Sequence, residues 1–231
     1  KLDRWILKKF FDNVIVVAET VLNDFHSPRK KVIANGLDIT RFEVNKELRQ
    51  KFRAAYHVTE DETLIGIVGR LSVEKHQELF IHAAHDFLRQ KKNVKFVIVG
   101  NGPEEERLKS LVMAYGLKKE IIFTGLIEDV AGVYQGLDIF TLTSNTEGIP
   151  LTILEAMASR VVVAATNVGG ISQIVFQRET GMLIEKNDKA GLVKVWQELV
   201  EDSNLREKLI RYAYEYVKNE FSNGPCSPHT A

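Results

Sequence analysis

The chain has 231 residues, of which 45% are hydrophobic and 27% charged, and its 31 Lys and Arg residues balance 31 Asp and Glu residues. Such a composition supports a folded core, and the zero formal net charge provides no overall field that would favour nucleic acid or a membrane surface as a partner. No apolar run reaches the roughly 20 residues that span a bilayer, and no signal peptide is visible. Because Cys226 is the single cysteine, no internal disulfide can form, and we expect a cytoplasmic protein.

Residues 1–45 contain two short β-branched runs and two helical segments. We predict a helix over residues 2–11, a strand over 14–17, a helix near 19–25 and a strand over 31–34. These elements are too few to bury their own faces, and the chain opens on Lys1 rather than methionine. We therefore expect 1–45 to be the remnant of a preceding α/β domain, with a linker at 38–45. The polar segment 222–231 is expected to be a disordered tail.

From residue 46 onward, strands alternate with helices in a regular order. Strands are predicted at 64–68, 94–99, 121–124, 139–143, 161–165 and 181–184. Helices are predicted at 46–56, 77–90, 104–115, 130–135, 150–159, 189–201 and 204–220, with a short one starting at Ile171. Alternation of this kind requires right-handed crossovers and gives a parallel sheet covered on both faces. We therefore predict a doubly wound, Rossmann-like α/β domain over residues 46–221.

Two glutamates follow the strand predicted to end at Thr143. Glu147 lies in a polar loop, and Glu155 lies about a turn and a half inside the apolar helix that begins at Pro150. Open α/β sheets bind ligands at such loops, and the N–H groups at a helix start attract anions. The helix around Glu155 is expected to be covered on most sides, with Leu151 on its buried face, so the carboxylate needs partners such as the vicinal hydroxyls of a ribose. The alternative is an ordinary solvated glutamate.

A second polar loop, Gly69–Lys75, follows the first strand of this domain. Its glycine spacing matches neither a Walker loop nor a dinucleotide fingerprint, which argues against an oxidoreductase. Arg70 can bridge phosphate oxygens with two N–H groups, and Lys75 can add a point charge. Two ordinary solvated cations are the alternative.

Three further segments are less specific. The loop Gly100–Pro103 is best explained as a tight turn that starts an acidic helix. The pair Gly169-Gly170 either lets backbone N–H groups approach a ligand or simply permits a turn. His82 and His85 lie three residues apart on a helix without a cysteine or carboxylate partner in the pattern, so we expect no metal site there.

Taken in their order, these motifs resemble one known family. From about residue 12 to residue 221 the sequence is similar to the C-terminal, donor-binding half of the GT-B glycosyltransferases of family four, which are retaining enzymes that use nucleotide sugars. The segments that carry the resemblance are Val32–Asp38, Gly69–Lys75, Val99–Pro103, Phe123–Gly125, Glu147–Glu155, Gly169-Gly170 and Thr180–Ile184.

The resemblance implies a role for each matching residue. The implied catalytic residues are Arg70, Lys75 and Glu147, with the two cations holding the donor diphosphate and stabilising the charge that develops as the sugar leaves. The implied donor-binding residues are Gly69, Gly125, Leu126, Gly148, Ile149, Pro150, Leu151 and Glu155. Glu155 would bind the ribose hydroxyls, and residues 125–127 would meet the base. Because the cations supply the positive charge, no metal and no other cofactor is expected.

Three positions depart from the family pattern. Arg160 stands where the family usually has a glycine, so it must either adopt a left-handed backbone or reshape the end of its helix. Val162 stands where a proline is usual, and Gln173 replaces a glutamate, so no role can be carried over for that carboxylate.

The resemblance implies an enzyme that transfers a sugar from a nucleoside diphosphate donor to an acceptor with retention. The missing N-terminal domain would bind the acceptor and would provide any peripheral membrane association. This chain alone is therefore expected to bind nucleotide but to transfer hardly any sugar. Two alternatives stay open. One is a nucleotide-sugar 2-epimerase of the same architecture, and the other is a catalytically degenerate nucleotide-binding or scaffold module.

Overall fold

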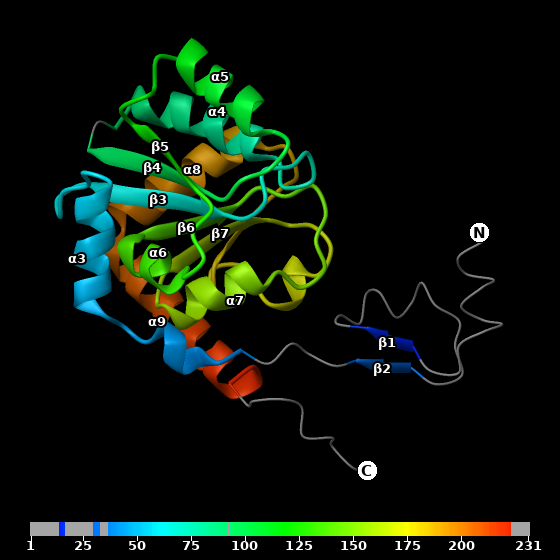
Figure 1. The fold of residues 1–231 in the computed structure, drawn as a ribbon. Helices are drawn as coiled ribbons and strands as arrows, with labels where there is room; N and C mark the ends of the chain where they lie inside the picture. The colour runs from blue at the N-terminus through cyan, green and yellow to red at the C-terminus, as the bar shows by residue number, and fades with distance from the viewer. Residues whose placement is uncertain (1–13, 17–29, 33–36, 92, 223–231) are drawn as a thin grey trace, which may run out of the picture.

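The computed structural model describes residues 14–16, 30–32, 37–91 and 93–222 (Figure 1). Its main body is a parallel six-stranded sheet of order β5-β4-β3-β6-β7-β8 between two layers of helices. The strands are β3 (Thr63–Val68), β4 (Val94–Val99), β5 (Ile121–Gly125), β6 (Ile139–Leu142), β7 (Val162–Thr166) and β8 (Met182–Ile184). This is the doubly wound, Rossmann-like fold predicted from the alternation of strands and helices.

The helices of the main body lie within two residues of their predicted ends. They are α3 (Lys46–Ala55), α4 (Gln77–Leu88), α5 (Glu105–Ala114), α6 (Ala131–Gly136), α7 (Leu151–Ala158), α8 (Lys189–Glu201) and α9 (Ser203–Glu220), with short 3₁₀ turns η1 (Ile39–Phe42) and η2 (Ile171–Gln173). Helices α4, α5 and α8 cover one face of the sheet, α3, α6 and α7 cover the other, and α9 contributes to both cores. Among the described residues, no helix is both long and apolar enough to cross a membrane.

Each face of the sheet has its own core. On the α4–α8 side, the fully buried Trp196 packs at 5.3 Å from Phe80 and 5.2 Å from Phe96, measured between ring centroids. The indole N–H of Trp196 donates to Oγ1 of the buried Thr141 at 2.9 Å, so its polar atom is satisfied. These contacts join helices α4 and α8 to strands β4 and β6 in the middle of the sheet.

The sheet reverses its winding between β3 and β6. These two strands are neighbours, with Ile65 opposite Ile139 and Gly66 opposite Phe140. The chain leaves β3 toward β4 on one side and leaves β6 toward β7 on the other. Because the two crossovers diverge, a crevice opens beyond the carboxyl ends of β3 and β6, and this is where sheets of this class bind ligands.

The N-terminal region contains two of its predicted elements. β1 (Val14–Val16) and β2 (Lys30–Val32) pair in parallel as a small separate sheet, in agreement with the two β-branched runs. The helices predicted at 2–11 and 19–25, and the tail segment 223–231, lie outside the described residues.

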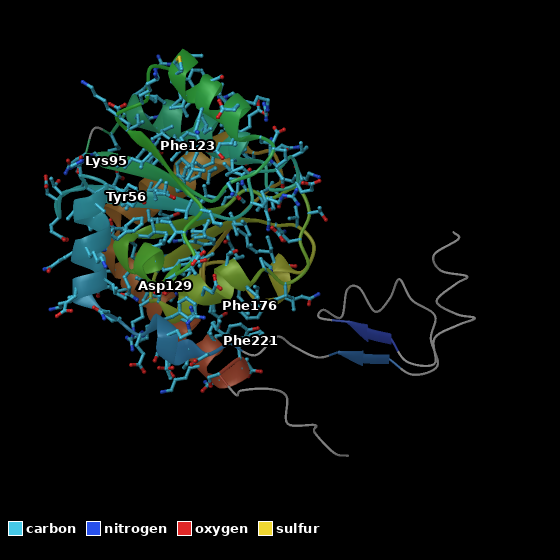
Figure 2. All side chains as sticks on the ribbon, viewed as in Figure 1. Tyr56, Lys95, Phe123, Asp129, Phe176 and Phe221 are labelled. Atoms are coloured by element: carbon cyan, nitrogen blue, oxygen red, sulfur yellow. The ribbon has the colours of Figure 1, made fainter. Side chains whose placement is uncertain are left out.

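The segment predicted as a linker, 38–45, packs on the main body. Phe42 is buried, and Asn45 caps α3 by accepting the backbone N–H of Leu48 at its Oδ1, at 3.1 Å. The N–H of Leu37 donates to the carbonyl of Phe221 at 2.9 Å, so this segment runs beside the end of α9 (Figure 2). The division of the chain into domains at residue 45 stays a prediction.

Candidate functional site at the carboxyl edge of the sheet

Lys75 and Glu147 meet across the crevice between β3 and β6. Lys75 lies in the loop after β3 and Glu147 in the loop after β6, and the Nζ of Lys75 is 2.6 Å from Oε1 of Glu147. The same oxygen accepts the hydroxyl of the fully buried Ser144 at 2.5 Å. The two side chains of the ion pair are only 26% and 10% exposed, so water screens their attraction poorly. Two of the three predicted catalytic residues are thus in direct contact.

Several hydrogen bonds hold these two loops together. The backbone N–H of Asn145 donates to the carbonyl of Glu74 at 2.7 Å, and the Asn145 side-chain amide donates to the carbonyl of Val73 at 3.2 Å. The hydroxyl of Thr143 lies 3.1 Å from the carbonyl of Lys75 and 2.9 Å from that of His76. Thr143 and Asn145 were not candidates from the sequence, because a polar residue after a strand carries no signal of the loop that it will meet.

The Gly169-Gly170 pair packs against the backbone of Glu147 and Gly148. A Cβ at Gly169 would lie 1.9 Å from the carbonyl oxygen of Glu147, and one at Gly170 would lie 2.4 Å from that of Gly148. The φ of Gly169 is +55°, a conformation that favours glycine. The sequence left two explanations of this pair open, a permitted turn or a close approach of backbone N–H groups to a ligand. In the structure, the two glycines allow the backbones of two loops to approach closely. They set the position of Glu147.

The Gly100–Pro103 loop supports the loop after β3 in the same way. A Cβ at Gly100 would lie 2.0 Å from the carbonyl oxygen of Gly69, and one at Gly102 would lie 2.2 Å from that of Leu71. The N–H of Leu71 donates to the carbonyl of Asn101 at 2.8 Å. These contacts agree with the structural explanation of the motif.

An open groove of about 680 Å³ lies beside the crevice, over the carboxyl ends of β3, β4 and β5. Gly69 and Arg70 from the loop after β3, and Leu126 and Ile127 from the loop after β5, are among the residues that line it. Arg70 is exposed, and its carbonyl accepts the side-chain amide of Gln77 at 2.8 Å, which fixes the loop below the guanidinium. Gly125, just before Leu126, has a φ of +72° that turns the chain out of β5. Of the predicted site residues, Gly69, Arg70 and Leu126 line this groove, whereas Lys75, Glu147 and Glu155 do not.

Glu155 lies on α7 and is hydrogen-bonded to a buried tyrosine. The hydroxyl of Tyr134 donates to Oε2 of Glu155 at 2.7 Å. Burial, followed by the charge of Glu155, raises the pKa of Tyr134 well above its usual range, so its proton stays on the phenol. This contact agrees with the expectation that the Glu155 carboxylate needs a partner. Tyr134 itself was not identified from the sequence.

The helix around Glu155 is covered as expected, with one exception. Ile153, Leu154, Ala156 and Met157 are fully buried. The prediction that Leu151 lies on the buried face is wrong, because Leu151 is 41% exposed. It is the first residue of α7, where the helix emerges from the core at the loop that contains Gly148, Ile149 and Pro150.

Arg160 adopts the left-handed backbone, which is one of the two conformations left open by the sequence. Its φ is +59°, its N–H donates to the carbonyl of Met157 at 3.1 Å, and the N–H of Val161 donates to that of Ala156 at 2.9 Å. This is the hydrogen-bond pattern that glycine usually completes at a helix end. The guanidinium carbon of Arg160 lies 4.1 Å from the ring centroid of Tyr214 on α9, a contact that offsets the backbone strain.

His82 and His85, on α4, both contact Tyr115. Nδ1 of His82 lies 2.7 Å from the hydroxyl of Tyr115, and the ring of His85 stacks on Tyr115 with centroids 4.2 Å apart. Within the described part of the chain, no group of three or more His, Cys, Asp or Glu residues could hold a metal ion.

Residues 48–216 match the family model of the group 1 glycosyl transferases. The chain belongs to this family. The family resemblance inferred from the sequence is therefore confirmed. The fold is also similar to that of the crystal structure of the C-terminal domain of a group 1 family protein, LpcC from Francisella tularensis. That domain is 31% identical, with a TM-score of 0.72, and the match covers 80% of this chain and 98% of that one.

Two curated proteins are similar to this chain over most of its length. An uncharacterized glycosyltransferase of Methanocaldococcus jannaschii is 28% identical over 88% of this chain and 54% of its own length. The lipopolysaccharide core mannosyltransferase LpcC of Rhizobium leguminosarum bv. viciae is 27% identical over 95% of this chain and 62% of its own length. The chain thus spans between about half and three fifths of the length of these two relatives.

The fold also matches a more distant solved structure. Anabaena HepE, crystallised in complex with UDP-glucose, superimposes with a TM-score of 0.88 at 22% identity, over 95% of this chain and 62% of HepE. At this identity the match shows the fold alone. The roles of single residues in this chain stay predictions.

Proposed function

We propose that this chain is the donor-binding domain of a retaining glycosyltransferase that takes its sugar from a nucleoside diphosphate sugar. The observation that carries the proposal is the Lys75–Glu147 pair at the point where the sheet reverses, with Arg70 on the adjoining groove. Two cations, and a carboxylate paired with one of them, match a ligand that carries both phosphates and hydroxyls.

In this proposal the cations act on the leaving group. Arg70 and Lys75 hold the diphosphate. The bond between the anomeric carbon and the phosphate oxygen breaks, and its electron pair passes to the diphosphate. The acceptor oxygen bonds to the anomeric carbon, and the acceptor's proton is released. The two side chains stabilise the charge that develops in the transition state more than they stabilise the ground state, and this lowers the barrier. Glu147 aligns Lys75 and faces the sugar. Since both cations come from the protein, we propose that neither a metal nor another cofactor is needed.

The rest of the donor would lie around the loop after β6, the start of α7 and the groove. Glu155 would accept the ribose hydroxyls, the backbone around Gly148–Leu151 would face the sugar and phosphates, and residues 125–127 would meet the base. HepE was crystallised in complex with UDP-glucose, so UDP and a UDP-sugar are included among the probes.

The acceptor would be bound mainly by a domain that precedes residue 46. The relatives are longer than this chain, which supports a second domain in the active enzyme. We also propose a cytoplasmic enzyme whose peripheral membrane association, if it has one, is provided by that other domain.

The test is a transfer assay on the longer polypeptide, with UDP-, GDP- and ADP-sugars, a panel of acceptors, and NMR assignment of the product anomer. We expect transfer with retention, and little turnover by residues 1–231 alone. Inversion, or sugar epimerised at C2 and released without an acceptor, would contradict the proposal and favour the 2-epimerase. Failure of every nucleotide to bind would favour the scaffold module.

A further inference from the structure

Tyr134 places a phenol inside the core, where its hydroxyl needs a partner. The side chain is fully buried, and its ring makes edge contacts with Phe42 and Phe140 at centroid distances of 6.0 and 5.8 Å. These contacts leave the ring little freedom to turn. The hydroxyl therefore has a fixed position, and it lies 2.7 Å from Oε2 of Glu155.

The Tyr134 hydroxyl gives the Glu155 carboxylate a hydrogen-bond donor. Glu155 is half-buried, on a helix whose residues Leu154 and Ala156 are fully buried, so its carboxylate loses part of its hydration. Among the described residues, Tyr134 is the one side chain that hydrogen-bonds to it. A hydrogen bond to a charged acceptor is stronger than one between neutral groups, so the phenol selects one orientation of the carboxylate.

One neutral donor does not satisfy a carboxylate, which can accept about four hydrogen bonds. The free capacity of Glu155 suits a ligand with adjacent hydroxyls, which is the donor ribose under the proposed function. A glutamate that is already oriented loses less side-chain entropy when the ligand binds.

We propose that Tyr134 is a positioning residue that orients the Glu155 carboxylate for the two ribose hydroxyls of the donor. The proposal rests on the proposed function, because it takes the ligand of Glu155 to be a nucleotide. Tyr134 touches Glu155 and not the ligand, so its removal should act only through that carboxylate.

The test is calorimetry on this chain with the tightest binder among UDP, GDP and ADP, and with the matching 2′,3′-dideoxynucleoside diphosphate. We expect Tyr134→Phe to weaken binding of the ribonucleotide about tenfold and to leave the dideoxynucleotide within about twofold. The matched control is Tyr115→Phe, which removes a hydroxyl bonded to Nδ1 of His82 and should change neither affinity.

A double-mutant cycle separates positioning from a structural role. In a Glu155→Ala background, Tyr134→Phe should have no further effect on ribonucleotide affinity. An equal loss for both nucleotides, or a loss that persists without Glu155, would overturn the positioning role while the proposed function stands. Equal ribonucleotide affinity of the Tyr134→Phe and unmodified chains would do the same. If the unmodified chain binds none of the three nucleoside diphosphates, the proposed function itself fails.

Discussion

The Nζ of Lys75 and Oε1 of Glu147 lie 2.6 Å apart, although 71 residues separate them along the chain and each belongs to a different crossover of the sheet. Ser144 donates to the same oxygen. The pair therefore joins the loops after β3 and β6 through a charge–charge contact that is largely hidden from solvent.

We predict that the pair is coupled in stability as well as in binding. Lys75→Met should lower the free energy of unfolding by about 1–2 kcal/mol, because it leaves the 10%-exposed Glu147 with Ser144 as its remaining side-chain donor in the described structure. Lys75→Met combined with Glu147→Gln should recover most of that loss and still bind nucleotide poorly. Urea unfolding of the four proteins measures the coupling. Additive effects would show that the two groups do not interact in solution.

Arg70 should matter for binding and little for stability. Its guanidinium is exposed on the wall of the groove, so Arg70→Ala is expected to change the free energy of unfolding by less than about 0.5 kcal/mol. The same change should weaken a nucleoside diphosphate about tenfold and leave the free nucleoside unaffected, since only the diphosphate needs the cation. Calorimetry with both ligands tests this, with the exposed Arg89→Ala as the control. An equal loss for nucleoside and diphosphate would contradict a phosphate role.

Gly169→Ala should displace the Glu147 loop. The added Cβ would meet the Glu147 carbonyl oxygen at 1.9 Å, and the φ of +55° is itself unfavourable for alanine. We expect a loss of about 2–4 kcal/mol in the free energy of unfolding, with weaker nucleotide binding. The control is Gly132→Ala in α6, where a Cβ meets nothing within 4 Å and should stabilise the helix by about 0.5–1 kcal/mol. Thermal melts that place both variants at the same stability would refute the close contact.

Arg160 should tolerate glycine better than alanine. Arg160→Gly removes the strain of the left-handed backbone and also the contact with Tyr214, so the two effects should nearly cancel, within about 0.5 kcal/mol. Arg160→Ala keeps the strain and loses the contact, so it should destabilise the chain by about 0.5–1 kcal/mol. Chemical denaturation distinguishes the two variants. A more stable Arg160→Ala than Arg160→Gly would mean that the left-handed conformation carries no cost.

The order of the elements was predictable because hydrophobic periodicity is a local property. Short runs rich in β-branched residues, such as Val94–Val99, mark strands that are largely buried on both faces, and the amphipathic segments between them mark covering helices. The ends of Gln77–Leu88 were less certain, since a helix ends where its hydrogen bonds and neighbours end. The wrong placement of Leu151 has the same origin, because apolar spacing along a helix does not tell where the helix leaves the core.

The candidate site was predictable as a set of loops, and much less as a set of contacts. Arg70, Lys75 and Glu147 follow strand ends, and the carboxyl ends of parallel strands share one edge. The partners that set their geometry, such as Thr143, Ser144 and Tyr134, are distant in sequence or chemically ordinary. Their roles follow from the packing of side chains in three dimensions, which residue spacing does not report.

The central claim is that the carboxyl edge of this sheet binds a nucleoside diphosphate without a metal. The most direct measurement is isothermal titration of residues 1–231 with UDP, GDP and ADP in buffer containing a chelator, with a thermal melt at saturation. We predict that at least one nucleotide binds with 1:1 stoichiometry, that the chelator leaves its affinity unchanged, and that a hundredfold excess over Kd stabilises the chain by about 2.7 kcal/mol. Absence of both heat and a thermal shift with all three nucleotides, or binding that requires an added divalent cation, would contradict the account.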